Sequence, residues 1–512
     1  MIINRGRCPN ESSASTGYPG ALFWHRLKFR VRPILVAPSL HSDSPPMRHC
    51  WPALLGSLCI VLSGCSAFTP TALPKAPSQP PVSEKWQAPL AHGGSVTALS
   101  SWWERVGDDT LPALITLAQE ASPTLSAAAT RVEEARLQQV VGLAALGPSL
   151  DASAAANRGN TQYPLPLSRT TSGAIAASWE ADLFGAQKLA VKAAEARAAS
   201  AQAQWHDARV VVAAETAVRY LSLRYCEAVR TEIEQDLSSA DTLGKLARLG
   251  SDAGLLANSL ADQARAQQAA VRASLLGQQS ACDLEVKALV ALTALPEPEL
   301  RTRLAREAGR PLDVPPALAI QKLPAQVVAQ RPDVYAAERD IIAAASEVGE
   351  TQALRLPRLS IGGSIGVFSV RGGPLAADLN TWSIGPLRLQ VPLYDGGIRQ
   401  AQVKAAEARF DSAVRVYEAR VRQAVREVEE ALVQSHFNAE RLAQVRSARQ
   451  ALERSLNAAE RRTVAGLASR QALEEARRQL IAVRINELAL IREGLIAGVS
   501  LYRAAGGGWD TP

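Results

Sequence analysis

Two long stretches of the chain place apolar residues three or four positions apart and contain no proline. In the second stretch, from Ile398 to Thr463, these positions are Val414, Tyr417, Val421, Val425, Val428 and Leu432. The spacing predicts one amphipathic helix, which at 1.5 Å per residue would be roughly 100 Å long. The first stretch, about 186–248, predicts a helix of nearly equal length. Such lengths are unusual in globular domains and are typical of coiled-coil assemblies.

Four shorter segments alternate between two kinds of residue with a period of two. In one of them Ile361, Ile365 and Val367 alternate with small polar or glycine positions. This period predicts β-strands, since successive strand side chains point to opposite faces. The four predicted strands cover about 149–157, 171–179, 359–370 and 381–391.

The pattern occurs twice along the chain. The heptapeptide VKAAEAR occupies 191–197 and 403–409, and three other landmarks recur at nearly the same offset: Pro123 with Pro332, Pro148 with Pro357, and Gly254-Leu255 with Gly466-Leu467. Ordered landmarks at an almost constant offset indicate an internal duplication. We interpret residues 101–310 and 311–505 as two copies of a unit with the order helix, strand, strand, long helix, helix. The predicted fold class is mainly α with a membrane β-barrel.

The predicted strands constrain the assembly. No segment after residue 65 has the roughly 18 apolar residues that a membrane helix needs, which leaves strands as the candidate membrane-crossing elements. Four strands from one chain cannot close a barrel, and open edges are not tolerated in lipid. Three chains would supply twelve strands around a lumen. We therefore expect a homotrimer whose 12-stranded β-barrel continues into a periplasmic α-helical coiled-coil barrel.

The net charge of +7 is concentrated at the N-terminus. Residues 1–64 contain seven Lys or Arg and two Asp or Glu, which leaves 7 − 5 = +2 for the rest of the chain. We therefore expect no nucleic-acid partner. The cysteines and histidines include no CxxC pair and are scattered, and no phosphate-binding loop, GxSxG or HExxH occurs. We expect no metal, no cofactor and no enzymatic activity.

The N-terminal region predicts processing and lipid attachment. Met47 and Arg48 precede an apolar stretch that ends in Leu-Ser-Gly-Cys at Cys65, which is the layout of a secretory signal. The ending resembles a bacterial lipobox, and this resemblance implies lipid on Cys65 and sorting to the outer membrane. We expect 1–46 to be a misannotated extension, 47–64 a signal peptide, 65–100 a lipidated tether, and the Gly-rich 506–512 a flexible tail.

Four motifs together carry a resemblance to a known family. The chain reads WEADLFG at 179–185, QRPDV at 330–334 followed by PRLS at 357–360, VPLYDGG at 391–397 and ALVALT at 288–293. These segments resemble the signatures of outer-membrane efflux lipoproteins of the TolC/OprM (NodT-type) family. The resemblance implies the exit duct of a tripartite pump, with a periplasmic adaptor (membrane fusion) protein and an inner-membrane RND pump as partners, exporting small molecules such as drugs.

The two Gly-Leu turns are expected to be periplasmic tips, and the resemblance implies that the adaptor docks there. The residues concerned are Arg248, Gly254, Leu255, Arg461, Arg462, Gly466 and Leu467. By position, Glu475 matches an acidic residue of the family's aperture, whereas Ala472 occupies a second acidic position. Glu474 is considered as a substitute. Three copies of such a carboxylate would favour cations, and the alternative is a solvated helix face.

Cys226 and Cys282 lie at equal distances from the predicted turn at Gly254, since 254 − 226 = 28 and 282 − 254 = 28. In an antiparallel helix pair these positions are side by side, and the periplasm is oxidising. We predict a Cys226–Cys282 disulfide, with two separately buried thiols as the alternative.

Three other functions use similar elements. An outer-membrane exit for secreted polypeptides (type I secretion) shares the fold, although the lipoprotein motifs favour small-molecule efflux. A poreless structural coiled-coil lipoprotein needs neither strand pairs nor a duplication. An adaptor protein carries small β domains rather than two copies of this unit.

Overall fold

The computed structural model describes residues 109–159, 167–306, 309, 324–373 and 375–509, which all belong to one compact unit, Phe68–Pro512. The expectations for 1–46, 47–64, 65–100 and the lipidation of Cys65 fall outside these residues. Within the described part of the chain, every helix lacks a sustained apolar run of the length that a bilayer crossing requires.

The described elements form two series. The first is α3 (Thr110–Ala121), α4 (Pro123–Ala144), β1 (Ser149–Gly159), β2 (Ser168–Ala181), α5 (Ala186–Asp252), α6 (Asn258–Thr293) and α7 (Glu297–Ala305). The second is α8 (Pro324–Ala329), α9 (Pro332–Ala353), β3 (Arg358–Gly372), β4 (Leu375–Gln390), α10 (Ile398–Val464) and α11 (Arg470–Ala504). Both long helices and all four strands predicted from the sequence are confirmed; their ends agree within four residues, except that β4 begins six residues earlier than predicted.

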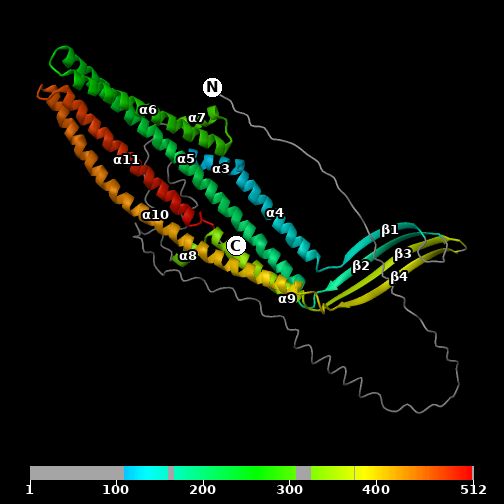
Figure 1. The fold of residues 1–512 in the computed structure, drawn as a ribbon. Coiled ribbons are helices and arrows are strands. Elements are labelled where there is room, and N and C mark those ends of the chain that lie inside the picture. Colours follow the sequence, from blue (N-terminus) through cyan, green and yellow to red (C-terminus); the bar gives the residue numbers. More distant parts are fainter. Residues whose placement is uncertain (1–108, 160–166, 307–308, 310–323, 374, 510–512) are drawn as a thin grey trace, which may run out of the picture. The chain divides into compact units, whose positions relative to one another are not determined.

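The two series match closely in length (Figure 1). Helices α5 and α10 each have 67 residues and begin 212 positions apart (398 − 186). Helices α4 and α9 each have 22 residues and begin 209 positions apart (332 − 123). The paired helices α6 and α11 have 36 and 35 residues.

Two similar turn motifs act as helix caps. The N-caps of α5 and α10 are Gly185 and Gly397, both in the left-handed region at φ +79° and +87°, where glycine has no Cβ penalty. An aspartate a few residues earlier accepts backbone hydrogen bonds from the first turn. Asp182 accepts from Gln187 and Lys188 at 3.2 and 3.0 Å, and the α10 cap uses Asp395 in the same way. These carboxylates satisfy amide groups that a helix start leaves open.

The four strands form one antiparallel sheet in the order β1-β2-β3-β4. The register places Ala152, Ile175, Ile365 and Trp382 in one row across the sheet. The adjacent row, which points to the other face, consists of Asp151, Ala176, Ser364 and Ser383. The sheet therefore has an apolar face and a face of small and polar residues, and β1 and β4 are edge strands.

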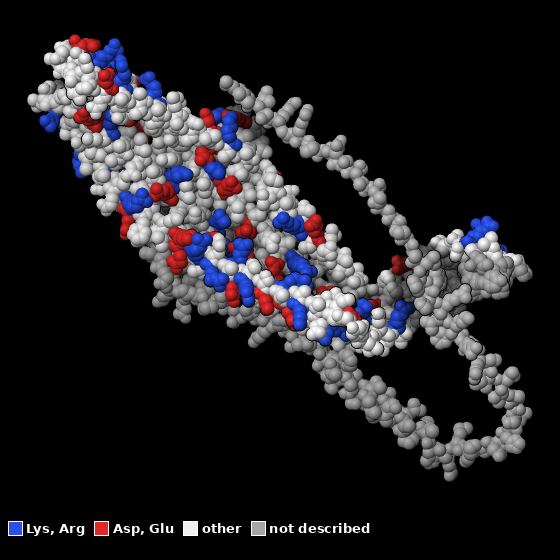
Figure 2. Space-filling model, in the orientation of Figure 1, with Lys and Arg blue, Asp and Glu red and all other residues white. Residues whose placement is uncertain are grey.

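The largest apolar core lies where the helices of both series meet. It contains residues of α3, α5, α6, α7, α10 and α11, among them the fully buried Tyr220, Leu289, Leu300, Leu490 and Leu495. Helix α5 is at its centre, because it contacts α4, α6, α9 and α11. On the face drawn in Figure 2, positive and negative side chains intermingle along this helical body.

Candidate functional site: the helical tips and the polar face of the sheet

The tips of the two helix hairpins are built on the predicted glycines. Gly254 and Gly466 adopt φ +70° and +74°, which allows the chain to reverse immediately after a helix. The amide groups that follow return to the helix, as Leu255 N donates to Gly250 O at 2.8 Å and Leu467 N donates to Arg462 O at 2.7 Å. The leucine side chains at the two turns are 85% and 72% exposed. An apolar residue held out at a tight turn is available for contact with a partner.

The basic residues predicted at the tips lie around these turns. Arg248 is exposed and lies 4.0 Å from Asp252 on the same helix. Arg461 and Arg462 lie in the last turn of α10, where a positive charge is favourable to the helix dipole.

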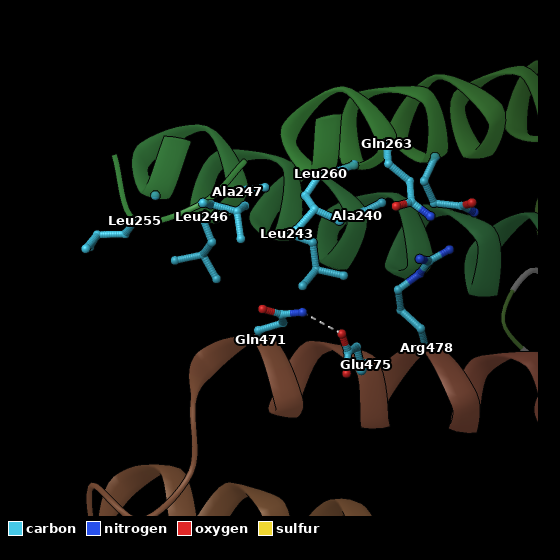
Figure 3. Close-up of a pocket in the computed structure, with 14 residues that line it drawn as sticks. Ala240, Leu243, Leu246, Ala247, Leu255, Leu260, Gln263, Gln471, Glu475 and Arg478 are labelled. Carbon is cyan, nitrogen blue, oxygen red and sulfur yellow. Dashed lines mark hydrogen bonds between the residues drawn. The ribbon is translucent and has the colours of Figure 1, made fainter. Parts of the chain in front are cut away.

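A groove of about 660 Å³ lies between the first hairpin and the start of α11 (Figure 3). One wall carries apolar residues of α5 and α6, and the α11 wall carries the polar residues Gln471, Glu475 and Arg478. The apolar lining consists of Ala240, Leu243, Leu246, Ala247, Leu255, Leu256, Leu260 and Ala264. Helix α6 also contributes Gln263 and Gln267, so the tip offers a hollow with a mainly apolar wall facing a polar one.

The two neighbouring glutamates considered for an aperture occupy different environments. Glu475 is exposed, lines the groove and accepts a hydrogen bond from Gln471 at 2.9 Å. Glu474 is only 2% exposed and lies 3.0 Å from Arg470 and 3.2 Å from Arg477. Adjacent positions on a helix point about 100° apart, so Glu474 faces the interior while Glu475 faces the groove. The burial of Glu474 and its two arginine partners contradict its use as a substitute aperture charge.

An ion pair joins α11 to α5 at the inner end of the groove. Arg478 donates to both carboxylate oxygens of Asp236, at 2.6 and 3.3 Å, and both side chains are about one-fifth exposed. A second, longer contact of 3.9 Å links Arg484 to Glu232. These contacts hold the first hairpin to the second within one chain.

The cysteines predicted to lie together are adjacent between α5 and α6. Their Cα atoms are 5.5 Å apart and their sulfur atoms are bonded in the structure. Cys226 is buried, and the side chain of Gln278 donates to its carbonyl oxygen at 3.1 Å. The second hairpin has a different contact at the corresponding level: buried Asn438 donates to the carbonyl oxygen of Leu490 at 2.9 Å.

Sequence reasoning missed a charged cluster around the buried Arg331. It lies at the root of the second hairpin, which is the end remote from the tip. Arg331 is 5% exposed and makes a bidentate contact with Asp333 at 2.8 and 2.9 Å. It also donates to Glu427 at 2.8 Å and to the carbonyl oxygen of Ala504 at 3.0 Å. Burial alone would lower the pKa of Arg331, but the two carboxylates raise it above its ordinary value. The QRPDV motif thus links α9, α10 and α11, beyond starting a helix.

The pKa values of two carboxyl groups are shifted here, that of Glu427 within the cluster and that of Asp207 beside it. Burial would raise the pKa of Glu427, but hydrogen bonds from Gln423 and Arg331 lower it. Asp207 on α5 shows the opposite shift, since burial and the nearby carboxylate of Asp333 raise its pKa. The cluster therefore stabilises one ionised carboxylate and disfavours another.

The end of the chain packs on this cluster. A Cβ atom at Gly506 would lie 2.8 Å from the carbonyl oxygen of Gln330, so the backbone fits there only as glycine. The ring of Trp509 lies 5.2 Å from that of Tyr335 and 6.1 Å from that of His206. Residues 506–509 are thus packed, which corrects the expectation of a flexible tail from 506; residues 510–512 are outside the described range.

The remaining features concern metal binding and the two faces of the sheet. Within the described ranges, no group of three or more His, Cys, Asp or Glu side chains could hold a metal ion. The polar face of the sheet carries hydroxyl groups that bond across strands, as Ser149 with Ser178 at 2.8 Å and Ser364 with Ser383 at 3.0 Å. Such a face can border water, while the opposite face, with Trp382 and Ile384 at 74% and 85% exposure, can border an apolar medium.

Comparison with known proteins gives consistent matches over most of the chain. A family model described as "Outer membrane efflux protein" matches residues 114–295 and 323–507. The chain is 29% identical over 479 residues to the outer membrane protein OprJ of Pseudomonas aeruginosa, which covers 88% of this chain and 95% of that protein. It is 28% identical over 474 residues to the solvent efflux pump outer membrane protein SrpC of Pseudomonas putida, covering 88% and 97%.

Solved structures agree on the fold. The structure of the open state of the MtrE outer membrane channel of Neisseria gonorrhoeae matches with a TM-score of 0.72 at 22% identity. The match covers 86% of this chain and 98% of that chain.

Proposed function

Because the chain belongs to the outer membrane efflux protein family, we propose that it is the outer-membrane exit duct of a tripartite RND-type efflux pump for small molecules such as drugs. The observation that carries the proposal is the sheet, which has one apolar face, one hydroxyl-lined face and two open edges. An apolar exterior with a polar interior is what a membrane barrel requires. The relatives named for solvent efflux support small molecules as the cargo.

The open edges of the sheet support a homotrimer. Strands β1 and β4 leave unpaired backbone groups, which are costly in lipid. Joining β4 of one copy to β1 of the next would satisfy both edges, and three copies would give twelve strands around a lumen. The long helices would continue this barrel as a coiled-coil duct of roughly 100 Å into the periplasm.

The equal lengths of the two series support an internal duplication. The helices α5 and α10, and likewise α4 and α9, agree in length, and their offsets of 212 and 209 equal those of the sequence landmarks. We infer that two similar units, 101–310 and 311–505, form each chain. Three chains would then place six similar units around the duct axis.

Attachment at the membrane would use both the barrel and lipid. The lipobox-like sequence ending at Cys65 supports a lipidated N-terminus, and the proline-rich segment that follows supports a tether to the folded body. Mass spectrometry of the mature N-terminal peptide tests this: we expect acylated Cys65, and an unmodified peptide beginning upstream of Cys65 would contradict it.

The tips would receive the periplasmic adaptor, which in turn connects the duct to the inner-membrane RND pump. The exposed turn leucines and the groove beside them support this role, because exposed apolar residues next to charged ones are characteristic of contact sites. Within this arrangement, Glu475 rather than Glu474 would supply an aperture charge, since Glu475 is exposed.

A disulfide between Cys226 and Cys282 would fix the first hairpin. The adjacency of the two residues supports it, and peptide mapping with and without reductant tests it. We expect a cross-linked peptide pair that disappears on reduction, and identical maps under both conditions would contradict the disulfide.

Efflux of ethidium from cells lacking this chain tests the proposed function. We expect accumulation to rise on deletion and to return to normal with the intact chain. Purified protein in planar bilayers provides the second measurement. Stable conductance without ethidium efflux would point to another cargo, and absence of conductance would indicate a poreless structural lipoprotein and overturn the proposal.

A further inference from the structure

Three arginines form one row across the end of the sheet that is remote from the helices. The register pairs Arg158 of β1 with Arg169 of β2, and Arg169 with Arg371 of β3. All three are exposed, and β4 places Ala376 at the same level. Figure 2 shows basic side chains gathered at this end of the sheet. The chain therefore presents three neighbouring guanidinium groups, here called the arginine row.

We propose that the arginine row binds the phosphate groups of lipopolysaccharide, the main lipid of the outer leaflet of a bacterial outer membrane. The inference rests on the proposed function, because it requires the sheet to be the part of the duct that crosses this membrane. The partner is thus an anionic glycolipid that offers both phosphate groups and acyl chains.

The arginine row lies on the apolar face of the sheet. Side chains an even number of residues apart on a strand point to the same face. Arg169 is six positions from Ile175 on β2, and Arg371 is six positions from Ile365 on β3. Both isoleucines belong to the apolar face, which borders lipid in the proposed duct. The arginines therefore point toward the membrane and away from the lumen.

The height of the row matches the boundary between acyl chains and headgroups. From Trp179 to Arg169, β2 runs ten residues (179 − 169 = 10), which is about 33 Å of strand. Strands in membrane barrels are tilted by about 35–45°, so this length covers about 25 Å of height, the extent of the apolar band. Tryptophan is enriched at membrane–water interfaces. With Trp179 at the periplasmic edge of the band, Arg169 reaches its outer edge.

The charges of the row are incompletely neutralised within the chain. Like charges directly opposite each other on neighbouring strands are unfavourable. Arg371 has a partner, since it lies 2.7 Å from Asp378 of β4. Arg158 and Arg169 form no ion pair with another residue that the structure describes. Two uncompensated charges per chain give 2 × 3 = 6 around the proposed trimer, which an anionic ligand would offset.

The backbone fixes the separation of these side chains. A Cβ atom at Gly372 would lie 2.7 Å from the Cβ atom of Ser168, so β2 and β3 approach closely just beyond the row. The hydroxyl group of Ser168 donates to the carbonyl oxygen of Gly159 at 3.3 Å, which links β2 to β1 at the same level. Guanidinium groups bind phosphate with paired hydrogen bonds, and adjacent strands present two of them to one ligand.

The surface beside the row favours a lipid over a free phosphate ion. Ile365 and Trp382 lie on the same face, nearer the helices, and are 63% and 74% exposed. These apolar side chains are positioned to contact acyl chains while the arginines hold the headgroup. A free phosphate ion would use the charges alone.

Native mass spectrometry of the purified trimer tests the proposal with phosphorylated lipid A and the same lipid A after removal of its phosphates. We expect the phosphorylated lipid to bind more tightly. Arg158→Gln combined with Arg169→Gln should weaken its binding by on the order of tenfold, through loss of charge-assisted hydrogen bonds. As a matched control, Arg131→Gln with Arg136→Gln removes the same charge from α4 and should leave binding unchanged.

Three outcomes would overturn the arginine row as a lipid site. These are equal binding of the two lipids to the wild-type chain, equal weakening by the two pairs of substitutions, and displacement of the lipid by millimolar inorganic phosphate, which would indicate a site for the free ion. The first comparison needs no variant, so it holds even if the substitutions impair folding. Conductance of the same trimer in planar bilayers separates the two proposals. Conductance without a preference for the phosphorylated lipid would leave the duct standing, and absence of conductance would overturn the proposed function itself.

Discussion

The two helix hairpins of this chain, α5/α6 and α10/α11, have nearly the same lengths but are held together by different means. In the first hairpin, α6 is poorly buried and the bonded cysteines join it to α5. In the second, α11 is well buried, and the contact at the same level is the hydrogen bond from Asn438 to Leu490. Both contacts have the same separation from their tip glycine, since 254 − 226 = 28 and 466 − 438 = 28.

The difference teaches that a cross-link can replace packing where packing is absent. Helix α11 obtains its place from burial between two long helices and from ion pairs with α10, such as Arg441–Glu493 at 2.8 Å. Helix α6 has one long-helix neighbour inside the chain, so a covalent link compensates for the missing contacts.

The starts of α4 and α9, the helices that precede the two strand pairs, differ as well. Arg331-Pro332-Asp333 begins α9, and the segment 209 positions earlier, Ser122-Pro123-Thr124, begins α4. In the first series the Ser122 hydroxyl accepts from Leu125 N at 3.3 Å. In the second series the same place holds the buried arginine cluster. The same position of the two series thus holds a simple helix cap at α4 and a buried charged cluster at α9.

Removal of the cross-link should give the largest effect. The bonded cysteines are separated by 56 residues, and the chain-entropy relation gives about 4 kcal/mol for a loop of that size. We expect Cys226→Ala with Cys282→Ala to destabilise the first hairpin by this order. Hydrogen exchange should show faster exchange across α6 and unchanged exchange across α11; equal protection of both would contradict the comparison.

Substitution of Arg331 by Met should have the next largest effect on the free energy of unfolding. It would leave the partly buried carboxylates of Asp333 and Glu427, with side chains 15% and 20% exposed, without their shared cation, which costs on the order of 3 kcal/mol. Denaturant unfolding of the purified protein measures the loss. The matched change Ser122→Ala in the first series should cost about 1 kcal/mol, because only a cap is lost. Similar losses of stability for the two variants would show that the charged cluster around Arg331 contributes no more than the Ser122 helix cap.

Asn438→Ala should destabilise the second hairpin by about 1–2 kcal/mol. The carbonyl oxygen of Leu490 would lose its side-chain donor, although its helix bond is retained, and a small cavity would form. Hydrogen exchange in α11 measures the effect. An effect as large as that of the cysteine pair would indicate that the second hairpin is no better packed than the first.

The stability of the region around Arg331 should depend on pH through Glu427 and Asp207, in opposite directions. The pKa of Glu427 lies below its ordinary value of 4.5 in the folded protein, so its contribution to stability is present above pH 4.5 and is lost as the pH falls through the lowered pKa. Thermal unfolding followed from pH 7 down to about pH 3, which reaches below the ordinary pKa of 4.5, should therefore depend less on pH in Glu427→Gln than in the wild type. Asp207→Asn should have the opposite effect, because the raised pKa of Asp207 favours its protonated form.

The smallest effect should follow Arg478→Gln. The pair with Asp236 is partly exposed, and such pairs contribute about 0.2–1 kcal/mol. Stability should fall slightly at low salt and be unchanged at high salt. A loss that persists at high salt would show that the pair acts as a buried link.

Local signals in the sequence were sufficient for much of this fold. Helical spacing between the turn at Gly396-Gly397 and the tip at Gly466 located α10 within one residue of its observed end, and Gly254 located the other tip. The symmetry of Cys226 and Cys282 about Gly254 placed them side by side, because an antiparallel pair returns with constant rise.

The remaining features depend on contacts between distant segments. Arg331 meets Glu427 and Ala504, which are 96 and 173 residues away, so its spacing in the motif carries no trace of them. Glu474 and Glu475 look alike in sequence, and only the rotation of α11 against its neighbours decides which one is buried. The packing of residues 506–509 similarly comes from Trp509, whose ring lies near His206 of α5 and Tyr335 of α9.

The contact between Arg331 and Ala504 also has a consequence for biogenesis. Because a chain is synthesised from its N-terminus, Arg331 is exposed long before residue 504 emerges. Until then the guanidinium lacks one acceptor, and the aromatic rings of His206 and Tyr335 lack Trp509. The root of the second hairpin is therefore complete only in a fully synthesised chain. A prematurely terminated product would present an unfinished polar core, which proteases that recognise incompletely folded chains can degrade.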